Sequence, residues 1–285
     1  MNKKISIILP ARNESVSLEK LIPELKQEFS NIEIIIVNDG STDQTLEVAQ
    51  KHDVQIVNHP YPKGNGAAVK SGARAATGDI LVFMDADGQH QPKEIQKLLA
   101  KMVQGYDMVV GCRSNKAQAN WMRLILNKVY NFLASWITAQ KIYDLTSGFR
   151  VVDAMKFKEF LHLLPNGFSY PTTITMAFFR AGYSISYTNV DVLQRTGTSH
   201  IRPIKDGVRF FLIIFKVGTL YSPLKFFVPI SFIVFITGVS YYLYTFFTQG
   251  RFTNMSALLI TTSLLIFFIG IVSEQLTMLF YRDKK

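Results

Sequence analysis

Two aspartates, Asp85 and Asp87, directly follow an apolar run that ends at Met84, and their spacing suits a metal ion. Two carboxylates this close repel one another and lose hydration beside apolar residues, unless a cation lies between them. A hard divalent ion such as Mg²⁺ or Mn²⁺ accepts oxygen ligands and usually keeps open positions for phosphate oxygens. The pair therefore predicts a metal that joins the protein to a diphosphate. A solvated acidic turn without metal is the alternative.

Short polar side chains also follow two earlier β-branched runs, within residues 10–14 and 38–43. These side chains could form hydrogen bonds with the edge of a bound ligand, or they could only form helix caps and a turn. A third stretch, Lys63 to Val69, contains two glycines but has Val69 where the dinucleotide fingerprint needs a third glycine. Its backbone amides could approach a ribose or phosphate, or the loop could only turn the chain.

The elements that must position these residues follow from an alternation of short apolar runs and helical stretches. The pattern predicts strands at Ile5–Leu9, Glu33–Asn38, Gln55–Asn58, Ile80–Met84 and Met108–Gly111, and helices at Val16–Phe29, Gln44–Lys51, Gly66–Ala76 and Pro92–Lys101. Strands of continuous Ile and Val separated by helices indicate an α/β fold with a mainly parallel sheet between helices. Ligands of such sheets lie at the carboxyl ends of the strands, where the polar clusters fall.

Length and charge limit the classes of protein that fit. The chain has 285 residues and a formal net charge of +10. This length suits one α/β domain of about 200 residues with an appendage, or two small domains. The excess of basic groups implies an anionic partner, and we expect no nucleic acid because the cations lie beside apolar, Trp-bearing stretches. The single cysteine, Cys112, excludes a disulfide framework and a thiolate zinc cluster and indicates a reducing compartment.

Two long uncharged stretches predict membrane spans. Residues 226–247 form a run of 22 without a charge and residues 255–273 a run of 19, each long enough to cross about 30 Å of hydrocarbon. The short link between them makes a hairpin at 226–285, and flanking cations assign both termini and the N-terminal domain to the cytoplasm. Two buried helices of a soluble core are the alternative. The run Ile5–Leu9 is too short for a signal-peptide core.

Two basic stretches precede the spans. Between Cys112 and Tyr143 there is no acidic residue, and apolar residues with Trp121 and Trp136 recur at helical spacing, which predicts an interfacial helix at about 119–139 or a core helix. Residues 201–225 alternate cations with bulky apolar groups and predict an amphipathic juxtamembrane segment. Its charges could hold a lipid phosphate or only set the membrane topology.

The polar motifs, in this order and spacing, resemble those of family 2 glycosyltransferases with the GT-A nucleotide-sugar fold, over about residues 4–200. The motifs are Pro10–Glu14, Asn38–Asp43, Lys63–Ala68 and Asp85–Gln89. Within that family the chain is similar to dolichol-phosphate mannose synthase and to bacterial polyprenyl-phosphate glycosyltransferases. The resemblance implies a GT-A catalytic domain at 1–200 and inverting, metal-dependent transfer of a hexose from a GDP- or UDP-linked sugar to polyprenyl phosphate at the cytosolic face. A homo-oligomer is compatible with it.

The resemblance also implies roles for individual residues. The metal ligands would be Asp85, Asp87 and Gln89, with Mg²⁺ or Mn²⁺ as the cofactor. The catalytic residues would be Asp85, Asp87, Arg113 and Arg195. The nucleotide would be bound by Pro10, Ala11, Arg12, Glu14, Val37, Asp39, Gly64 and Ala86. The acceptor phosphate would be bound by Arg123, Ser199, His200 and Arg202, with His200 where a lysine is usual.

Three other functions share parts of this pattern. A processive polysaccharide synthase has the same fold, but neither tryptophan follows an arginine as in the Gln-x-x-Arg-Trp motif of those enzymes. Transfer to a different lipid or to a hydroxyl acceptor is the second. A hydroxyl acceptor would need a general base, for which Asp144 is our one nominee beyond residue 140. A non-catalytic, membrane-tethered protein that binds nucleotide sugars is the third reading.

Overall fold

The computed structural model of the protein describes residues 3–113, 121–167, 169–193, 212, 215–216 and 218–280, with backbone alone for 113, 121–127 and 280. By its internal contacts the chain divides into two compact units, Met1–Gly207 and Val208–Lys285. The first unit is an α/β sheet domain and the second is a helical hairpin.

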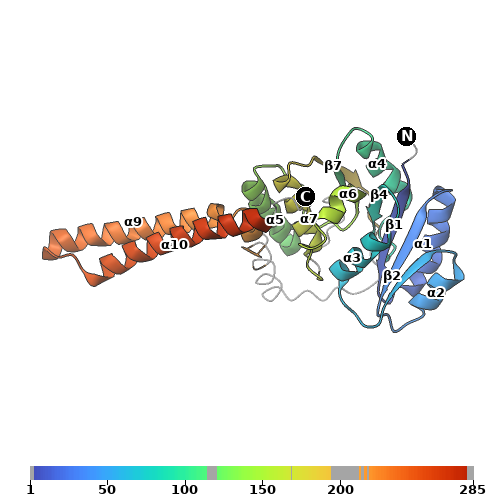
Figure 1. Cartoon of the computed structure of the whole chain (residues 1–285), viewed down its shortest axis with the longest axis horizontal. Coiled ribbons are helices and arrows are strands. Elements are labelled where there is room, and N and C mark those ends of the chain that lie inside the picture. Colours follow the sequence, from blue (N-terminus) through green and yellow to red (C-terminus); the bar gives the residue numbers. More distant parts are fainter. Residues whose placement is uncertain are drawn as a thin grey trace. The chain divides into compact units, whose positions relative to one another are not determined.

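The first unit is built on a seven-stranded sheet in the order β3-β2-β1-β4-β6-β5-β7 (Figure 1). Its strands are β1 (Ile5–Ala11), β2 (Glu33–Asp39), β3 (Gln55–His59), β4 (Ile80–Phe83), β5 (Met108–Arg113), β6 (Arg150–Asp153) and β7 (Ile185–Val190). Its helices are α1 (Ser15–Glu28), α2 (Thr45–Lys51), α3 (Asn65–Ala75), α4 (Lys93–Met102), α5 (Trp121–Thr138), α6 (Ala154–Glu159) and α7 (Tyr170–Arg180). The five strands and four helices predicted before residue 112 all form, within about two residues of their predicted ends.

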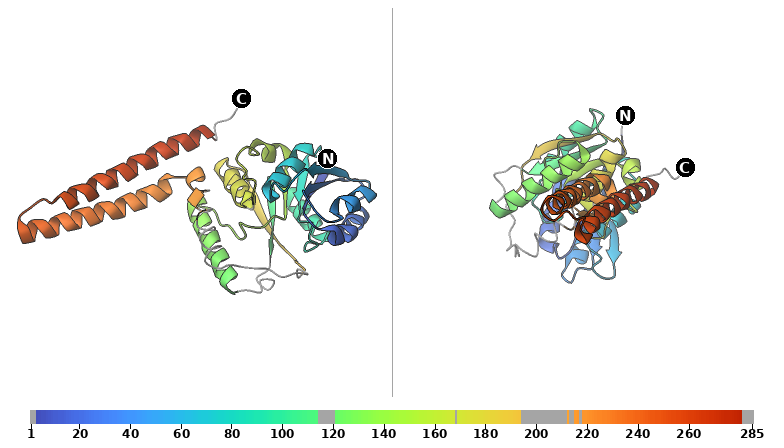
Figure 2. Two further views of the ribbon diagram at one scale, coloured as in Figure 1. Left: turned by 90° about the horizontal axis from the view of Figure 1, so that it is seen from below. Right: turned by 90° about the vertical axis from the view of Figure 1, so that its left-hand side faces the viewer.

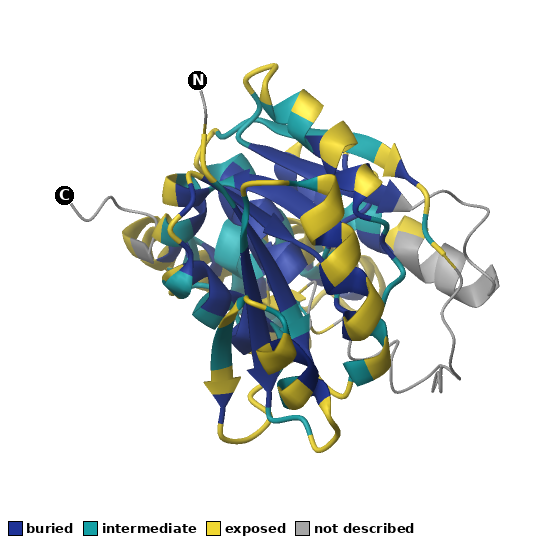
Figure 3. Cartoon of the chain, turned by 90° about the vertical axis from the view of Figure 1, so that its right-hand side faces the viewer, coloured by how far each residue is buried: buried dark blue, intermediate teal, exposed yellow. Residues whose placement is uncertain are grey.

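The alternating side chains of the central strands form two apolar layers, one on each face of the sheet. Ile7 and Leu9 of β1 pack with buried residues of α1, α2 and α4, whereas Ile8 contacts α3 on the opposite face. On that second face Phe83 of β4 packs on Phe157 of α6, with ring centroids 4.6 Å apart. The strands β1, β2 and β4 are buried on both sides (Figure 3), as their continuous Ile and Val runs predict.

Strand β6 is the one antiparallel member of this sheet among the described residues. It lies between β4 and β5, with Arg150 opposite both Phe83 and Val110. Because β6 runs against its neighbours, its first residue lies at the edge where β4 and β5 end. The segment before β6, residues 144–149, therefore reaches the same edge as Asp85.

Helix α5 has one apolar face buried in the domain and another exposed. Tyr130, Ala134 and Ile137 are buried, and the Tyr130 hydroxyl lies 2.7 Å from the Thr172 hydroxyl of α7. On another face Phe132 and Trp136 are 69% and 46% exposed. Helix α5 thus packs on the domain and still presents apolar side chains outward, as an interfacial helix would.

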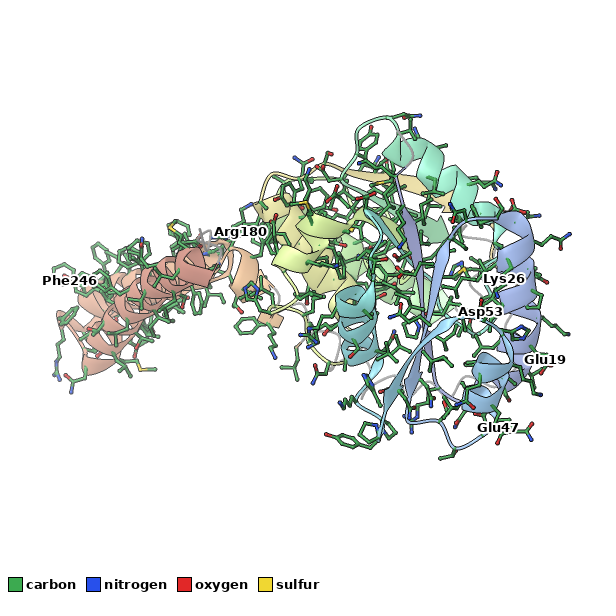
Figure 4. All side chains as sticks on the ribbon, turned by 45° about the vertical axis from the view of Figure 1, so that its right-hand side comes forward. Glu19, Lys26, Glu47, Asp53, Arg180 and Phe246 are labelled. Carbon is green, nitrogen blue, oxygen red and sulfur yellow. The ribbon has the colours of Figure 1, made fainter. Side chains whose placement is uncertain are left out.

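The second unit is a hairpin of two long helices, α9 (Leu224–Gln249) and α10 (Asn254–Phe280), which lie side by side (Figures 1 and 2). Both are long and apolar enough to cross a membrane. Small residues line their contact: a Cβ on Gly238 would meet Leu259 Cβ at 3.0 Å, and Ser231 donates to the Ser263 carbonyl at 2.8 Å. Apolar side chains such as Phe246 cover the outside of the pair (Figure 4).

The end of the hairpin near residue 224 holds a carboxylate. Glu274 of α10 accepts a hydrogen bond of 3.3 Å from the Leu224 backbone N–H, in the first turn of α9. The carboxylate therefore caps a neighbouring helix, which gives a structural reason for its place in an apolar stretch. Of the predicted amphipathic segment 201–225, residues 212, 215–216 and 218–221 are helical, and the others before residue 218 lie outside the described part of the chain.

Candidate active site

Three of the predicted motifs meet at one edge of the sheet. Strands β2, β1 and β4 are adjacent and parallel, so the residues that follow them lie at the carboxyl edge together. These residues are 12–14 after β1, 40–43 after β2 and 85–89 after β4. In a doubly covered parallel sheet this edge is where ligands bind.

Hydrogen bonds join the loop after β1 to the loop after β2. The Asn13 N–H donates to Ser41 Oγ at 3.0 Å, and Thr42 N–H donates to Asn13 Oδ1 at 2.8 Å. Asn13 adopts a positive φ of 57°, a conformation that asparagine tolerates better than most residues. The two loops therefore form one connected rim above the sheet.

The predicted nucleotide residues differ in what their side chains can reach. Ala11, Val37 and Ala86 are buried in the core, so only their backbones can face a ligand. Pro10 and Glu14 are half-buried, and Arg12 is exposed on the rim. Among the predicted nucleotide residues of this rim, Arg12 and Glu14 are thus the charged side chains that a ligand could meet directly.

Asp39, at the end of β2, lies at the centre of a hydrogen-bond cluster. Its Oδ1 accepts from the Lys63 N–H at 2.8 Å and lies 2.7 Å from His59 Nδ1, while its Oδ2 accepts from the Gly64 N–H at 2.8 Å. Burial alone would raise the pKa of Asp39, but the hydrogen bonds from His59, Lys63 and Gly64 outweigh it and hold the pKa below its usual value. Asp39 is therefore a buried, ionised anchor.

The same cluster decides what the glycine-containing loop does. The Gly64 N–H is used by Asp39, and the Ala67 N–H donates to the carbonyls of Gly64 and Asn166. These two amides are therefore bonded within the protein, and the loop fixes Asp39 instead of offering these amides to a phosphate. Gly64 itself has φ +102°, which only glycine adopts readily.

The acidic pair lies beyond β4 in a tight turn. Asp87 Oδ1 accepts from the Gln89 N–H at 3.1 Å, and Gly88 between them has φ +72°. Asp85 faces the segment before β6: a Cβ on Gly148 would lie 3.4 Å from Asp85 Oδ2 and from the Tyr170 hydroxyl. A side chain at residue 148 would thus pack directly against both groups.

A buried arginine that the sequence reading passed over lies beside Asp85. Arg150 is fully buried and donates to the carbonyls of Ser147 and Pro171 and to the Thr175 hydroxyl. Burial lowers the pKa of Arg150, and the nearby Tyr170, Tyr187, Asp144 and Asp85 act against that effect. A charged residue at the start of an apolar strand was the available signal, since such a charge is rarely buried without a role.

The nominated base, Asp144, forms a turn. Its Oδ1 accepts from the Thr146 N–H at 3.0 Å, the Thr146 hydroxyl at 2.9 Å and the Ser147 N–H at 3.1 Å. The carboxylate therefore shapes the segment that leads to Gly148 and Arg150.

The donor set at the end of β4 suits a hard divalent cation. Asp85, Asp87 and Gln89 are half-buried and supply two carboxylates and an amide oxygen. Within the described ranges no third His, Cys, Asp or Glu joins them into a closed metal cluster. An ion held here would keep open positions for phosphate oxygens, as Mg²⁺ and Mn²⁺ sites commonly do. The residues present therefore fit such an ion.

The remaining predicted site residues fall outside what the structure describes. For Arg113 the backbone ends β5, and for Arg123 it lies in α5, but their side chains are not described. Arg195, Ser199, His200 and Arg202 lie outside the described residues altogether. Their assignment to the diphosphate and to the acceptor phosphate stays a prediction.

A cavity of about 450 Å³ lies against β5 and β7, at the end of the sheet away from β3. Cys112, Lys141, Tyr143, Tyr187 and Asn189 are among its lining residues, and none of the predicted site residues is. Tyr143 and Tyr187 pack edge to face, with ring centroids 5.4 Å apart. We place the candidate site at the edge that holds Asp85 and Asp87, because their carboxylates are the charged metal-binding groups.

Two family models match the chain. The model described as "Glycosyl transferase family 2" matches residues 6–161, and the model described as "GtrB C-terminal hairpin" matches residues 222–279. The chain is 32% identical over 190 residues to undecaprenyl-phosphate 4-deoxy-4-formamido-L-arabinose transferase of Proteus mirabilis. That match includes 59% of this chain and spans 57% of the relative's length.

Solved structures with the same fold come from glucosyl-3-phosphoglycerate synthase of Mycobacterium tuberculosis. The complex with Mn²⁺ and UDP-glucose has a TM-score of 0.61 at 20% identity and covers 76% of this chain and 79% of that one. The complex with Mn²⁺, UDP and glucosyl-3-phosphoglycerate has a TM-score of 0.60 at 21% identity, covering 76% and 80%. At this identity the likeness establishes the fold.

Proposed function

The chain belongs to glycosyl transferase family 2, and from that premise we propose that it transfers a hexose from a nucleotide-diphosphate sugar to polyprenyl phosphate. The observation that supports the acceptor most directly is the hairpin at residues 222–279, which matches a "GtrB C-terminal hairpin". The relative from Proteus mirabilis is named for undecaprenyl phosphate. A membrane-anchored enzyme has ready access to such a lipid.

The donor would lie along the rim formed by the loops after β1 and β2. Asp39 would accept a hydrogen bond from the base, and Arg12 and Glu14 would contact the nucleoside. The backbones of Pro10, Ala11, Val37 and Ala86 would border it. Because the two loops are already joined through Asn13, the rim is preformed, and little conformational entropy would be lost when the nucleotide binds.

The diphosphate would lie over the acidic pair, where Asp85, Asp87 and Gln89 would hold Mg²⁺ or Mn²⁺. When bound, such an ion would neutralise the negative charge that develops on the departing diphosphate. The structural neighbour was solved with Mn²⁺ and UDP-glucose, which supports a divalent ion with this fold. Arg113 and Arg195 would add positive charge on the same side.

The acceptor needs little activation. A phosphate monoester has a second pKa of about 6 and is largely dianionic at pH 7, so no side chain has to remove a proton from it. That agrees with Asp144, which is engaged in three hydrogen bonds of a turn. The lipid phosphate would attack the anomeric carbon from the face opposite the diphosphate, with inversion. Arg123, Ser199, His200 and Arg202 would hold it.

We further propose that the reaction takes place at the cytosolic face, with both termini on that side. The two spans form a hairpin, and the cations before residue 226 and after residue 281 flank its open end. Each cation near an anionic leaflet contributes about 1 kcal/mol to membrane attachment. The exposed apolar face of α5 would lie at the same interface.

The test is a transfer assay on membranes that contain the full chain. They are incubated with radiolabelled nucleotide sugars and polyprenyl phosphate, with and without EDTA, and label is counted in the organic extract. We expect label in the lipid only when metal and polyprenyl phosphate are both present. Label that stays in the aqueous phase with every donor would contradict the proposal.

Two matched substitutions test the acidic pair. Asp87→Asn should reduce transfer by at least about 100-fold, because the amide carries no charge to bind the ion. Asp53→Asn, at an exposed residue before β3 (Figure 4), makes the same chemical change away from the site and should leave transfer unaltered. Full activity of Asp87→Asn would remove Asp87 from the metal site.

A further inference from the structure

The carboxylate of Asp39 has almost no free capacity to accept hydrogen bonds. An ionised carboxylate offers about four lone-pair positions, two on each oxygen. Oδ1 receives His59 Nδ1 and the Lys63 N–H, and Oδ2 receives the Gly64 N–H. No other donor among the described residues contacts this carboxylate. One acceptor position therefore remains, and it is on Oδ2.

His59 is the side chain that occupies one of the three filled acceptor positions of Asp39. It lies directly across from Asp39 in the register of β2 and β3, and both residues are buried, at 5% and 4% exposure. An ionised carboxylate can only accept, so Nδ1 must be the donor in the 2.7 Å contact. The opposite ring atom, Nε2, lies 2.9 Å from the Ser71 hydroxyl of α3, which fixes the ring from its other side.

A single free acceptor position on Asp39 limits which base of the nucleotide sugar can bind there. Uracil presents one N–H on its imide edge, whereas guanine presents N1–H and an amino group side by side. A guanine edge at Asp39 would find one acceptor for two donors and would leave one of them buried without a partner. An unsatisfied buried donor costs about 1–3 kcal/mol.

We propose that His59 is a specificity-determining positioning residue, which occupies one acceptor position of Asp39 so that the site selects uridine nucleotides over guanosine nucleotides. This inference rests on the proposed function, in which Asp39 meets the base. His59 itself would not touch the nucleotide, because its two nitrogens are engaged with Asp39 and Ser71.

The first experiment measures nucleotide binding to the full chain in detergent with Mn²⁺, by isothermal titration calorimetry. UDP should bind about 10- to 100-fold more tightly than GDP, the ratio that one unsatisfied donor produces. CDP is the matched ligand control, since cytosine has the size of uracil but carries a lone pair in place of the imide N–H. CDP should therefore bind as weakly as GDP.

The outcomes separate the inference from the proposed function. Equal affinities for UDP and GDP, or for UDP and CDP, would overturn the inference while leaving nucleotide binding in place. If no nucleotide binds and no label is transferred, the proposed function fails and the inference fails with it.

Variants of His59 test the mechanism of selection. His59→Leu frees a second acceptor position on Asp39, so the ratio of GDP to UDP dissociation constants should fall toward one. His59→Asn places an amide donor near the position of Nδ1 and should keep the ratio close to that of the unaltered chain. His162→Leu, at an exposed histidine of the same domain, makes the same change elsewhere and should not alter the ratio.

A purely structural role for His59 would give a different result. Affinities for UDP and GDP would then fall together in His59→Leu, with the ratio unchanged, and the inference would be wrong. The comparison of UDP with CDP in the unaltered chain stands even if His59→Leu does not fold.

Discussion

At the scale of the residue, Gly64 shows how closely the nucleotide loop is packed. It has φ +102°, and a Cβ there would lie 2.5 Å from the Asn166 carbonyl oxygen. The residue also donates its N–H to Asp39. A side chain at residue 64 would therefore strain the backbone, collide with the backbone of residues 166–167 and move a donor away from Asp39.

We expect Gly64→Ala to destabilise the domain by about 2 kcal/mol or more and to weaken nucleotide binding. Gly105→Ala is the matched control, because Gly105 has a similar φ of +95° but nothing within 4 Å of its Cβ position. That variant should show the strain alone, with nucleotide binding unchanged. Thermal unfolding and nucleotide titration measure both effects. Equal behaviour of the two variants would show that the collision with Asn166 does not matter.

Asp107 gives a pH-dependent prediction. It accepts from Lys156 and, at 2.7 and 2.8 Å, from the Ser184 N–H and hydroxyl, which ties β5 to the start of β7. Burial would raise the pKa of Asp107, but these hydrogen bonds and the Lys156 charge outweigh it, so the pKa lies below its usual value. A depressed pKa means that the stabilisation is present above the unfolded pKa and is lost as pH falls through the folded one.

Asp107→Asn should therefore lower stability by about 1 kcal/mol at pH 7 and by much less near pH 3. The measurement is the thermal unfolding midpoint of the detergent-solubilised variant and of the unaltered chain at both pH values. Asp53→Asn, at an exposed aspartate, should change the midpoint little at either pH. A difference that grows as the pH falls would mean that the sign is wrong.

Site residues that stand close together in the sequence could be predicted, whereas those whose partners are distant in the sequence could not. The pair Asp85 and Asp87 stands out because both carboxylates follow one strand. The partnership of His59 with Asp39 joins residues 20 positions apart and appears only when β2 and β3 are placed in register. Arg150 was missed because its partners, Ser147, Pro171 and Thr175, come from a turn and a distant helix.

At the scale of the element, the strands found from sequence are those with continuous Ile and Val runs. β1, β2 and β4 are buried on both faces and each contains an unbroken apolar run, at Ile7–Leu9, Ile34–Val37 and Ile80–Phe83. β6 has four residues and begins with Arg150, and β7 alternates polar and apolar residues at an edge, so neither carried that signal. Pairing with neighbours, which sequence does not display, makes them strands.

The hairpin gives a prediction at this scale. Glu274→Leu removes the acceptor for the Leu224 N–H and should destabilise the pair of helices by about 1 kcal/mol. Glu274→Gln keeps an acceptor oxygen and should behave nearly as the unaltered chain does. Gln275→Leu, at an exposed neighbour, is the control for a polar residue lost from α10. Thermal unfolding in detergent ranks the variants, and an unchanged midpoint for Glu274→Leu would show that this contact is dispensable.

At the scale of the whole molecule, the predicted topology can be tested through the single cysteine. Cys112 is the one cysteine of the sequence, so a Cys112→Ser chain gives a background without thiols. Cys112 is also buried. Arg251→Cys then places a thiol in the short exposed link between α9 and α10, and Lys51→Cys places one on the sheet domain. We expect a membrane-impermeant maleimide to label Arg251→Cys on intact cells, whereas Lys51→Cys should react only after the membrane is opened.

The reverse labelling pattern would place the sheet domain outside the cell and contradict the cytosolic orientation. That orientation follows from the cations that flank the open end of the hairpin, compared with the single Arg251 in its link.

The antiparallel placement of β6 has a consequence for how such enzymes could diversify. The end of β5 and the start of β6 lie at the same edge of the sheet, because the two strands are antiparallel, hydrogen-bonded neighbours. A segment of different length or composition could therefore be grafted between residues 113 and 150 without lengthening either strand. Chimeras that exchange this insert between relatives would keep the donor rim of β1 and β2, and their products would show whether the insert influences the choice of acceptor.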